Sequence, residues 1–208
     1  MGCNTMICSR DELFVLCCLW DCRAYLRLFL GGDPGLVFNI NYCPEDCRGA
    51  ILSLYSHGLI EWSVEGGEVV DIKDGLRNDA ARDVSNGIVI GLTEMGGCFF
   101  EDYFDIDWGG YVSEVFIEAD GGVIKASGMV VLGGIFDWIE KKGVYDFFDF
   151  TIDFGCDLIY WKKISCFNIH CFRRNSVIDG YELLREMIDV ISSNFDSLIA
   201  GKIRNALK

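Results

Sequence analysis

The sequence predicts an α+β protein, with a mainly helical part over residues 1–108 that includes a small hairpin, and an antiparallel sheet packed by helices over residues 109–208. Two observations predict this class: apolar residues repeat at helical spacing over 181–207, and they alternate with polar residues over 144–154. Hydrophobic residues make up 51% of the 208, enough for a sizeable core. The last helix must bury its apolar stripe against other elements, which is a reason for the two parts to share one core. Two separate domains are the alternative.

The first predicted helix begins at a capping box. Ser9-Arg10-Asp11-Glu12 allows the Ser9 hydroxyl to accept from the third helical amide while Glu12 reaches back to the first. We expect a helix over about 10–30, ended by the Gly-Gly-Asp-Pro-Gly stretch at 31–35. An alternating stretch then predicts a strand over 36–42.

A second helix is predicted from Pro44, which suits a first helical turn, to the His57-Gly58 pair, which is typical of a helix C-terminus. Thr93 is a suitable N-cap for a third helix that runs through Phe104. Three short strands are expected between these helices, over residues 59–64, 69–72 and 88–92.

This order of elements over residues 44–104 resembles a winged helix, in which a helix ending in "GLI" leads into a two-stranded wing and a helix opening with "LT" follows. The resemblance implies a DNA-docking helix at 44–57, which should carry basic residues. Arg48 is its single basic residue, beside Glu45 and Asp46. We therefore expect no nucleic-acid partner, and the alternative function is a degenerate winged-helix regulator or adaptor that acts through protein contacts.

The C-terminal part is predicted as an antiparallel sheet with two helices. The alternation over 144–154 places Phe148, Phe150, Ile152 and Phe154 on one face and the intervening polar residues on the other, and Gly155 is expected to turn the chain. Further strands are expected over 111–119, 123–126 and 158–172, and helices over 130–142 and 181–207, the last with an apolar face at 3–4 spacing.

The formal net charge is −14, and residues 99–160 alone contain 13 acidic and 3 basic residues. Such a surface repels phosphate backbones and attracts basic proteins. The longest apolar run near the N-terminus, at 13–20, is too short to span a membrane, and Met6 stands where N-myristoylation requires Ser or Thr. The odd number of cysteines, 11, favours a reducing cytoplasm, so we expect a cytoplasmic protein without a membrane partner.

Cysteine and histidine offer weak signals for chemistry. Cys43 and Cys47 form a C-x₃-C pair, and Cys166 with His170 could share a strand face, but neutral buried thiols are the favoured interpretation and we expect neither metal nor cofactor. His57 and His170 are the only histidines, and no nucleophile or phosphate-binding motif stands in a fitting context. We therefore expect no enzymatic activity, with an unrecognised enzyme as the second alternative.

Acidic residues interleaved with aromatic ones form the candidate partner-binding site. Aromatic side chains anchor protein interfaces, and carboxylates among them would steer a cationic partner. A solubilising surface is the competing interpretation of the same residues. The candidates, with the aromatic ones acting as anchors if exposed, are Phe100, Glu101, Asp102, Tyr103, Asp105, Asp107, Trp108, Tyr145, Asp146, Asp149 and Asp153.

A small, acidic chain that is rich in Phe and Cys, poor in Pro and without catalytic motifs resembles the bacterial immunity proteins of polymorphic-toxin and contact-dependent growth inhibition systems. The resemblance is one of style and covers the whole chain loosely. It implies a tight complex with a cognate basic toxin domain, a cytoplasmic location and no catalysis. A homodimer is compatible with the sequence as well.

Overall fold

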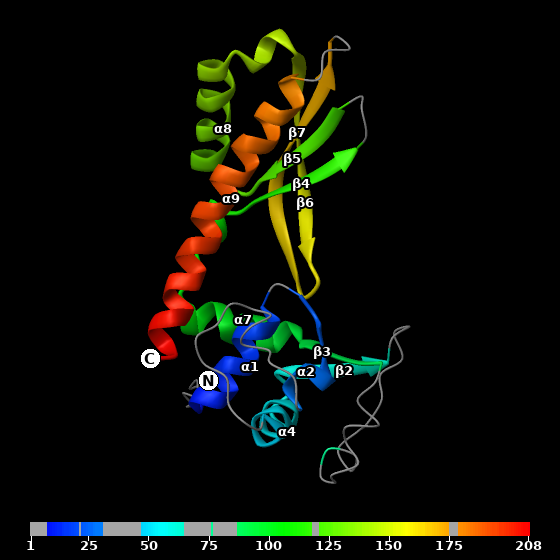
Figure 1. Cartoon of the computed structure of the whole chain (residues 1–208), viewed down its shortest axis with the longest axis vertical. Helices are drawn as coiled ribbons and strands as arrows, with labels where there is room; N and C mark the ends of the chain where they lie inside the picture. Colours follow the sequence, from blue (N-terminus) through cyan, green and yellow to red (C-terminus); the bar gives the residue numbers. More distant parts are fainter. Residues whose placement is uncertain are drawn as a thin grey trace. The chain divides into compact units, whose positions relative to one another are not determined.

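The computed structural model describes residues 8–20, 22–30, 47–64, 76, 87–117, 121–174 and 179–208 (Figure 1). The chain forms two compact units, which are described separately. Unit 1 comprises Met1–Asp105, Tyr160–Lys162 and Gly201–Lys208, and unit 2 comprises Ile106–Ile159 and Lys163–Ala200. The predicted α+β class is confirmed, since the chain combines helices with two antiparallel sheets.

Unit 1 surrounds a small antiparallel sheet in which β3 lies between β1 and β2. Trp62 stands opposite Ile90 in the register of β2 and β3, and both side chains are fully buried. The described elements are α1 (Arg10–Leu19), β1 (Ala24–Tyr25), α2 (Leu26–Phe29), α4 (Arg48–Ser56), β2 (Ile60–Val64), β3 (Ile88–Leu92) and α7 (Glu94–Phe104).

The predicted capping box of α1 is confirmed, because the Glu12 amide donates to the Ser9 hydroxyl at 3.2 Å and the Ser9 amide to the Glu12 carboxylate at 2.6 Å. The predicted length of this helix is wrong, since α1 ends at Leu19 instead of about 30. Two carbonyls at that end accept from side chains distant in sequence: Leu19 from the Tyr160 hydroxyl, and Trp20 from the Trp161 indole at 2.7 Å. These bonds replace those that further helical turns would make.

The predicted strands at 59–64 and 88–92 are confirmed as β2 and β3, which pair with each other. Thr93 caps α7 as predicted, accepting from the Gly96 amide at 3.0 Å. The helix predicted to end at His57-Gly58 does so, with Gly58 at a φ of 72°. The strands predicted over 36–42 and 69–72 lie outside the described residues.

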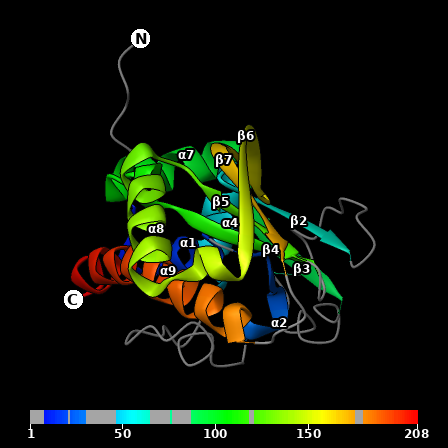
Figure 2. The same cartoon turned by 90° about the horizontal axis from the view of Figure 1, so that it is seen from above.

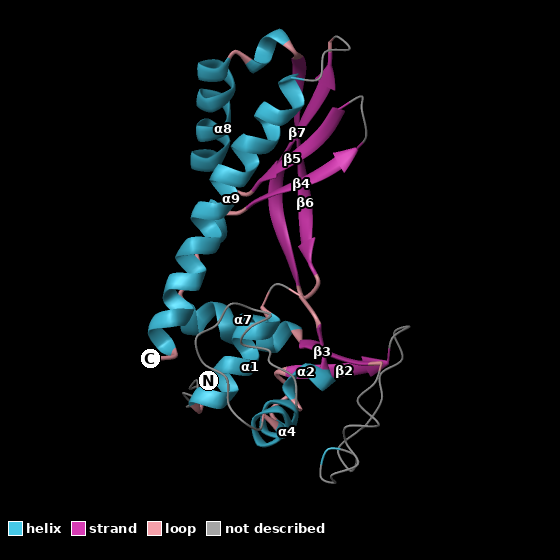
Figure 3. Cartoon of the chain, in the orientation of Figure 1, coloured by secondary structure: helices cyan, strands magenta, loops and turns pink. Residues whose placement is uncertain are grey.

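Unit 2 is a four-stranded sheet in the order β4-β5-β7-β6, with α8 and α9 on one face (Figures 1 and 2). Figure 3 shows the same two layers coloured as strand and helix. Side chains from both layers form one core, including Ile124, Ile135, Ile169 and Met187. The elements are η1 (Trp108–Gly110), β4 (Val112–Ile117), β5 (Gly121–Ala126), α8 (Met129–Lys142), η2 (Val144–Asp146), β6 (Phe148–Ile159), β7 (Lys162–Arg173) and α9 (Asp179–Ala206).

The strand β6 differs from its prediction at both ends. It begins at Phe148, because α8 ends at Gly143, whose φ is 68°, and the short 3₁₀ helix η2 follows directly. It continues to Ile159 and does not turn at Gly155. A side chain at position 155 would come within 2.2 Å of the Asn168 amide, so this glycine makes room for a neighbouring side chain within the sheet.

Candidate partner-binding surface

The candidate residues in unit 1 lie on α7 or directly after it. Phe100 was a candidate anchor, and this is wrong: its side chain is 0% exposed and packs against Phe104, with ring centroids 4.7 Å apart. Glu101 is half-buried and forms an ion pair with Lys162. Asp102 and Tyr103 are exposed, so two of the four candidates on α7, an acid and an aromatic residue, are accessible to a partner.

Asp105, the remaining candidate of unit 1, is exposed and ends α7 in a left-handed conformation with φ 49°. Short polar side chains such as Asp tolerate this conformation better than most others. The backbone carbonyl of Asp105 accepts from the Lys202 ammonium group. The role of Asp105 in ending the helix therefore explains the presence of an aspartate here, and no binding partner is needed to explain it.

In unit 2, the candidates Asp107 and Trp108 both contact residues of their own unit. The Asp107 carboxylate accepts from the Gly109 amide at 2.8 Å and caps η1. The Trp108 ring is half-buried and lies 5.6 Å from the Phe195 ring of α9 and 5.9 Å from Tyr111. This indole is partly covered by its own unit, so only part of it could contact a partner.

Tyr145 and Asp146 are exposed at the start of the unit 2 strand β6, on η2. The Tyr145 ring meets Phe150 edge-on with centroids 5.5 Å apart, and Phe150 meets Phe136 of α8 in the same way at 6.4 Å. A chain of ring contacts therefore connects Phe136 of α8, through Phe150, to the exposed Tyr145. Tyr145 has the exposure that the sequence interpretation requires of an anchor.

Asp149 and Asp153 lie on the polar face of β6, and each carboxylate is bound by side chains close to it. Arg174 donates through Nε to Asp149 at 2.7 Å, and this hydrogen bond holds the pKa of Asp149 below its ordinary value. Asn168 donates to Asp153 at 2.7 Å and His170 lies 3.0 Å from it, which together lower the pKa of Asp153. Both carboxylates are therefore ionised near neutral pH and oriented.

Asp157, on the same strand, serves the sheet itself. Its carboxylate accepts from the Tyr111 hydroxyl and the Lys125 ammonium group, each at 2.9 Å, and from the Ser113 hydroxyl. The Asp157 side chain is only 16% exposed, and burial raises the pKa of Tyr111 to about 12. Tyr111, just before β4, and the side chains of β4 and β5 reach β6 across β7, so we assign this cluster to cohesion of the sheet.

The sequence interpretation placed four apolar residues on one face of β6 and did not predict that two of them are exposed. Phe148 is buried as expected, but Ile152 is 49% and Phe154 71% exposed. Their neighbours Thr151 and Asp153 are exposed as well, so this stretch of strand is open on both faces. The length of the predicted strand, 144–154, is the signal that could have shown it, because a strand rises about 3.3 Å per residue and a helix about 1.5 Å, so the strand is longer than the preceding helix predicted over 130–142.

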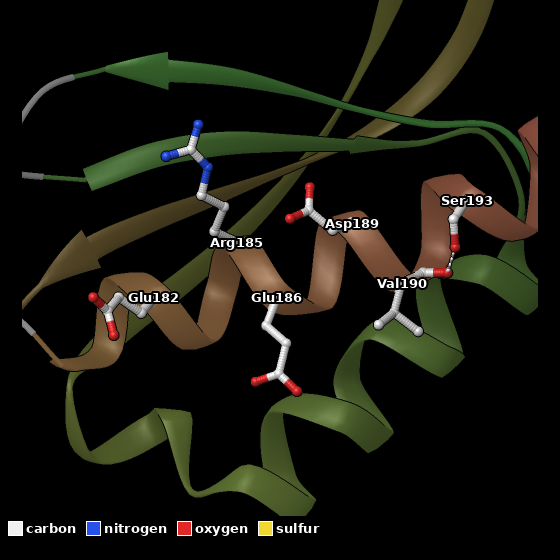
Figure 4. A pocket seen from close by; sticks show the side chains of 6 residues that line it. All are labelled: Glu182, Arg185, Glu186, Asp189, Val190 and Ser193. Atoms are coloured by element: carbon white, nitrogen blue, oxygen red, sulfur yellow. Dashed lines mark hydrogen bonds between the residues drawn. The ribbon is translucent and has the colours of Figure 1, made fainter. Parts of the chain in front are cut away.

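An open hollow of 520 Å³ lies on α9 (Figure 4). Arg185 and Glu186 project from opposite sides of the helix, and the Ser193 hydroxyl donates to the Val190 carbonyl at 2.9 Å. Its lining residues are Glu182, Arg185, Glu186, Asp189, Val190 and Ser193. The hollow offers charged groups on one helix and no nucleophile–base pair.

Metal ligation finds no support in the part of the chain that the structure describes, where no group of three or more His, Cys, Asp or Glu is placed to hold an ion. Cys171 belongs to the core while His170 faces Asp153, and Cys43 lies outside the described residues. No helix within the described ranges has the length and apolar character needed to cross a membrane. A scan of protein-family models and searches of curated proteins and solved structures each find no match to this chain.

Proposed function

We propose that the chain is a binding protein that neutralises a cognate basic toxin domain in the cytoplasm, as an immunity protein. The observation that carries this proposal is the stretch of β6 where exposed Ile152 and Phe154 alternate with the carboxylates of Asp149 and Asp153. Exposed apolar groups rimmed by charged ones are typical of protein interaction sites.

The charge of the chain supports a cationic partner. The net charge of −14 creates a field that accelerates encounter with a basic protein and slows encounter with a polyanion. Asp149 and Asp153 remain well exposed beside their internal partners, with 58% and 60% of each side chain accessible. A partner's lysines and arginines could therefore approach both groups without breaking the fold.

A second candidate function, a regulator that acts through protein contacts, is supported by the element order of unit 1. Among the described residues of 48–104, the helix α4 is followed by the paired strands β2 and β3 and then by the helix α7. The winged-helix resemblance implies this order. Arg48 is the one basic residue on α4, which disfavours DNA as the ligand.

The test is co-expression of the chain with the protein encoded immediately upstream of it. We expect a basic protein that is toxic when expressed alone, is harmless with this chain, and co-elutes with it on size exclusion. The matched control is the same neighbour expressed with an unrelated acidic protein, which should not protect. A harmless neighbour that never co-elutes would overturn the toxin proposal and favour the regulator.

A further inference from the structure

We propose that the partner docks by adding an extended segment of its own to the outer edge of β6, along Asp149–Gly155. This inference rests on the proposed function, since it names the element that receives the partner. β6 is the last strand of the sheet and is hydrogen-bonded to β7 and to no other strand among the described residues. An edge strand of this kind presents a row of backbone donors and acceptors that a partner strand can use.

One backbone hydrogen bond beside the β6–β7 ladder shows which residues of β6 turn their backbone groups toward β7. The Arg174 amide donates to the Phe147 carbonyl at 2.9 Å, so Phe147 turns its backbone groups toward β7. In an antiparallel pair the residues of one strand alternate between facing the partner and facing away. Ile152 and Phe154 therefore turn their N–H and C=O groups outward, while Thr151 and Asp153 bond to β7. The Asn168–Asp153 side-chain bond, between residues that this register places opposite each other, agrees.

The side chains of Asp149–Gly155 determine which partner sequence can pair with this edge. A strand laid along β6 would meet Ile152 and Phe154 on one face of the sheet, and Asp149 and Asp153 on the other. Opposite charges and paired apolar groups across neighbouring strands are stabilising. The edge therefore fits an extended segment in which basic and apolar residues alternate.

A second copy of this chain fits the same edge poorly. Each copy carries a net charge of −14, which opposes self-association. Antiparallel self-pairing centred on Thr151 would also place Asp149 of one copy opposite Asp153 of the other, and like charges in that position are destabilising. The stretch 148–159 contains no Lys or Pro, the residues that most often block edges, so its carboxylates exclude acidic strands while admitting a basic one.

The probe is a fluorescent synthetic peptide of alternating lysine and valine, long enough to pair with Asp149 through Gly155, titrated against the full chain by fluorescence polarisation. We expect saturable binding, and none by a peptide with glutamate in place of lysine. A lysine–valine peptide N-methylated at the amides that would face β6 should bind at least about tenfold more weakly, because it lacks main-chain hydrogen bonds.

Two variants of one position locate the binding. Phe154→Pro removes an outward N–H without removing a bond to β7 and should weaken binding at least about tenfold more than Phe154→Ala, which removes the ring and keeps the N–H. Circular dichroism verifies that both variants fold, and the N-methylated peptide tests the backbone without altering the protein. Equal binding by lysine and glutamate peptides, by methylated and unmethylated peptides, or no binding to the unaltered chain would each overturn the proposal.

The two proposals fail in different ways. A co-purified toxin that binds Phe154→Pro as tightly as the unaltered chain would overturn edge pairing and leave the immunity function standing. Peptide binding that depends on the β6 edge, together with an upstream-encoded protein that is harmless and does not bind, would support edge pairing and overturn the immunity function. A homodimer in light scattering that Phe154→Pro dissociates would assign the edge to a second copy and overturn the basic partner.

Discussion

Two exposed carboxylates of β6 each bind side chains of the same chain. Asp149 holds Arg174, and Asp153 holds Asn168 and His170. Exposed ion pairs of this type contribute little to the free energy of folding, because water screens them and ordering long side chains costs entropy. Their effect is instead on charge and orientation: both acids stay ionised at the pH where a basic partner would arrive.

Arg174→Gln should raise the pKa of Asp149 toward its ordinary value of 3.8 while leaving Asp153 unchanged. The folded pKa of Asp149 is lowered, so the interaction with Arg174 is fully present above that ordinary value and is lost as the pH falls through the folded pKa. Carboxyl titration by NMR measures both groups in the same sample. Identical Asp149 titrations with and without Arg174 would contradict the assignment, and Asn168→Ala, which should move only Asp153, is the control.

At the scale of the element, α7 is positioned by its two adjacent glycines. A β-carbon on Gly96 would stand 1.8 Å from the Leu59 carbonyl oxygen, and one on Gly97 would stand 1.9 Å from the Trp161 ring. Each glycine in a helix costs about 0.5–1 kcal/mol relative to alanine. The pair is explained by this close approach, which lets α7 lie directly on the backbone of Leu59, just before β2, and on Trp161.

Gly96→Ala should lower the free energy of unfolding by about 1–3 kcal/mol, because the clash is with backbone and outweighs the better helix propensity of alanine. Gly49→Ala is the matched control, since nothing lies within 4 Å of its β-carbon on α4. It should stabilise by up to about 1 kcal/mol. Urea denaturation followed by circular dichroism compares the two, and a stabilising Gly96→Ala would show that the contact with Leu59 is not tight.

For the whole molecule, the charge distribution decides which partners arrive quickly. The excess of acid is concentrated in residues 99–160, and 161–208 has 8 basic and 5 acidic residues. Some of those basic groups already bind carboxylates within their own unit, such as Lys162 with Glu101 and Arg174 with Asp149. The remaining field is long-ranged and acts on association rates more than on the lifetime of a complex.

Asp149→Lys combined with Asp153→Lys should slow association with the basic partner and make the association rate less dependent on salt. The dissociation rate should change less. Stopped-flow kinetics at two salt concentrations measures both. Glu182→Lys with Asp189→Lys makes the same charge change on α9 and is the control, which should slow association less. Equal slowing by both pairs would show that only net charge matters and that β6 has no special role.

The sequence allowed prediction of those elements that local signals specify. The Ser9 capping box, the Thr93 cap and the alternation of β6 all depend on neighbours in sequence. The end of α1 could not be predicted, because Leu19 and Trp20 are bonded by side chains 141 positions away. Burial of Phe100 and exposure of Phe154 likewise depend on where other elements begin and end, which periodicity alone does not encode.

The Arg10 guanidinium group donates to the carbonyl of Leu207, 197 positions further along, and Ile203 and Leu207 are buried in the same unit. During synthesis on the ribosome, unit 1 therefore begins first and is completed last, because it waits for residues 201–208. Unit 2 has all its residues by position 200 and can fold earlier. A nascent chain of this protein would thus fold unit 2 first, and the core around α1 would be completed last.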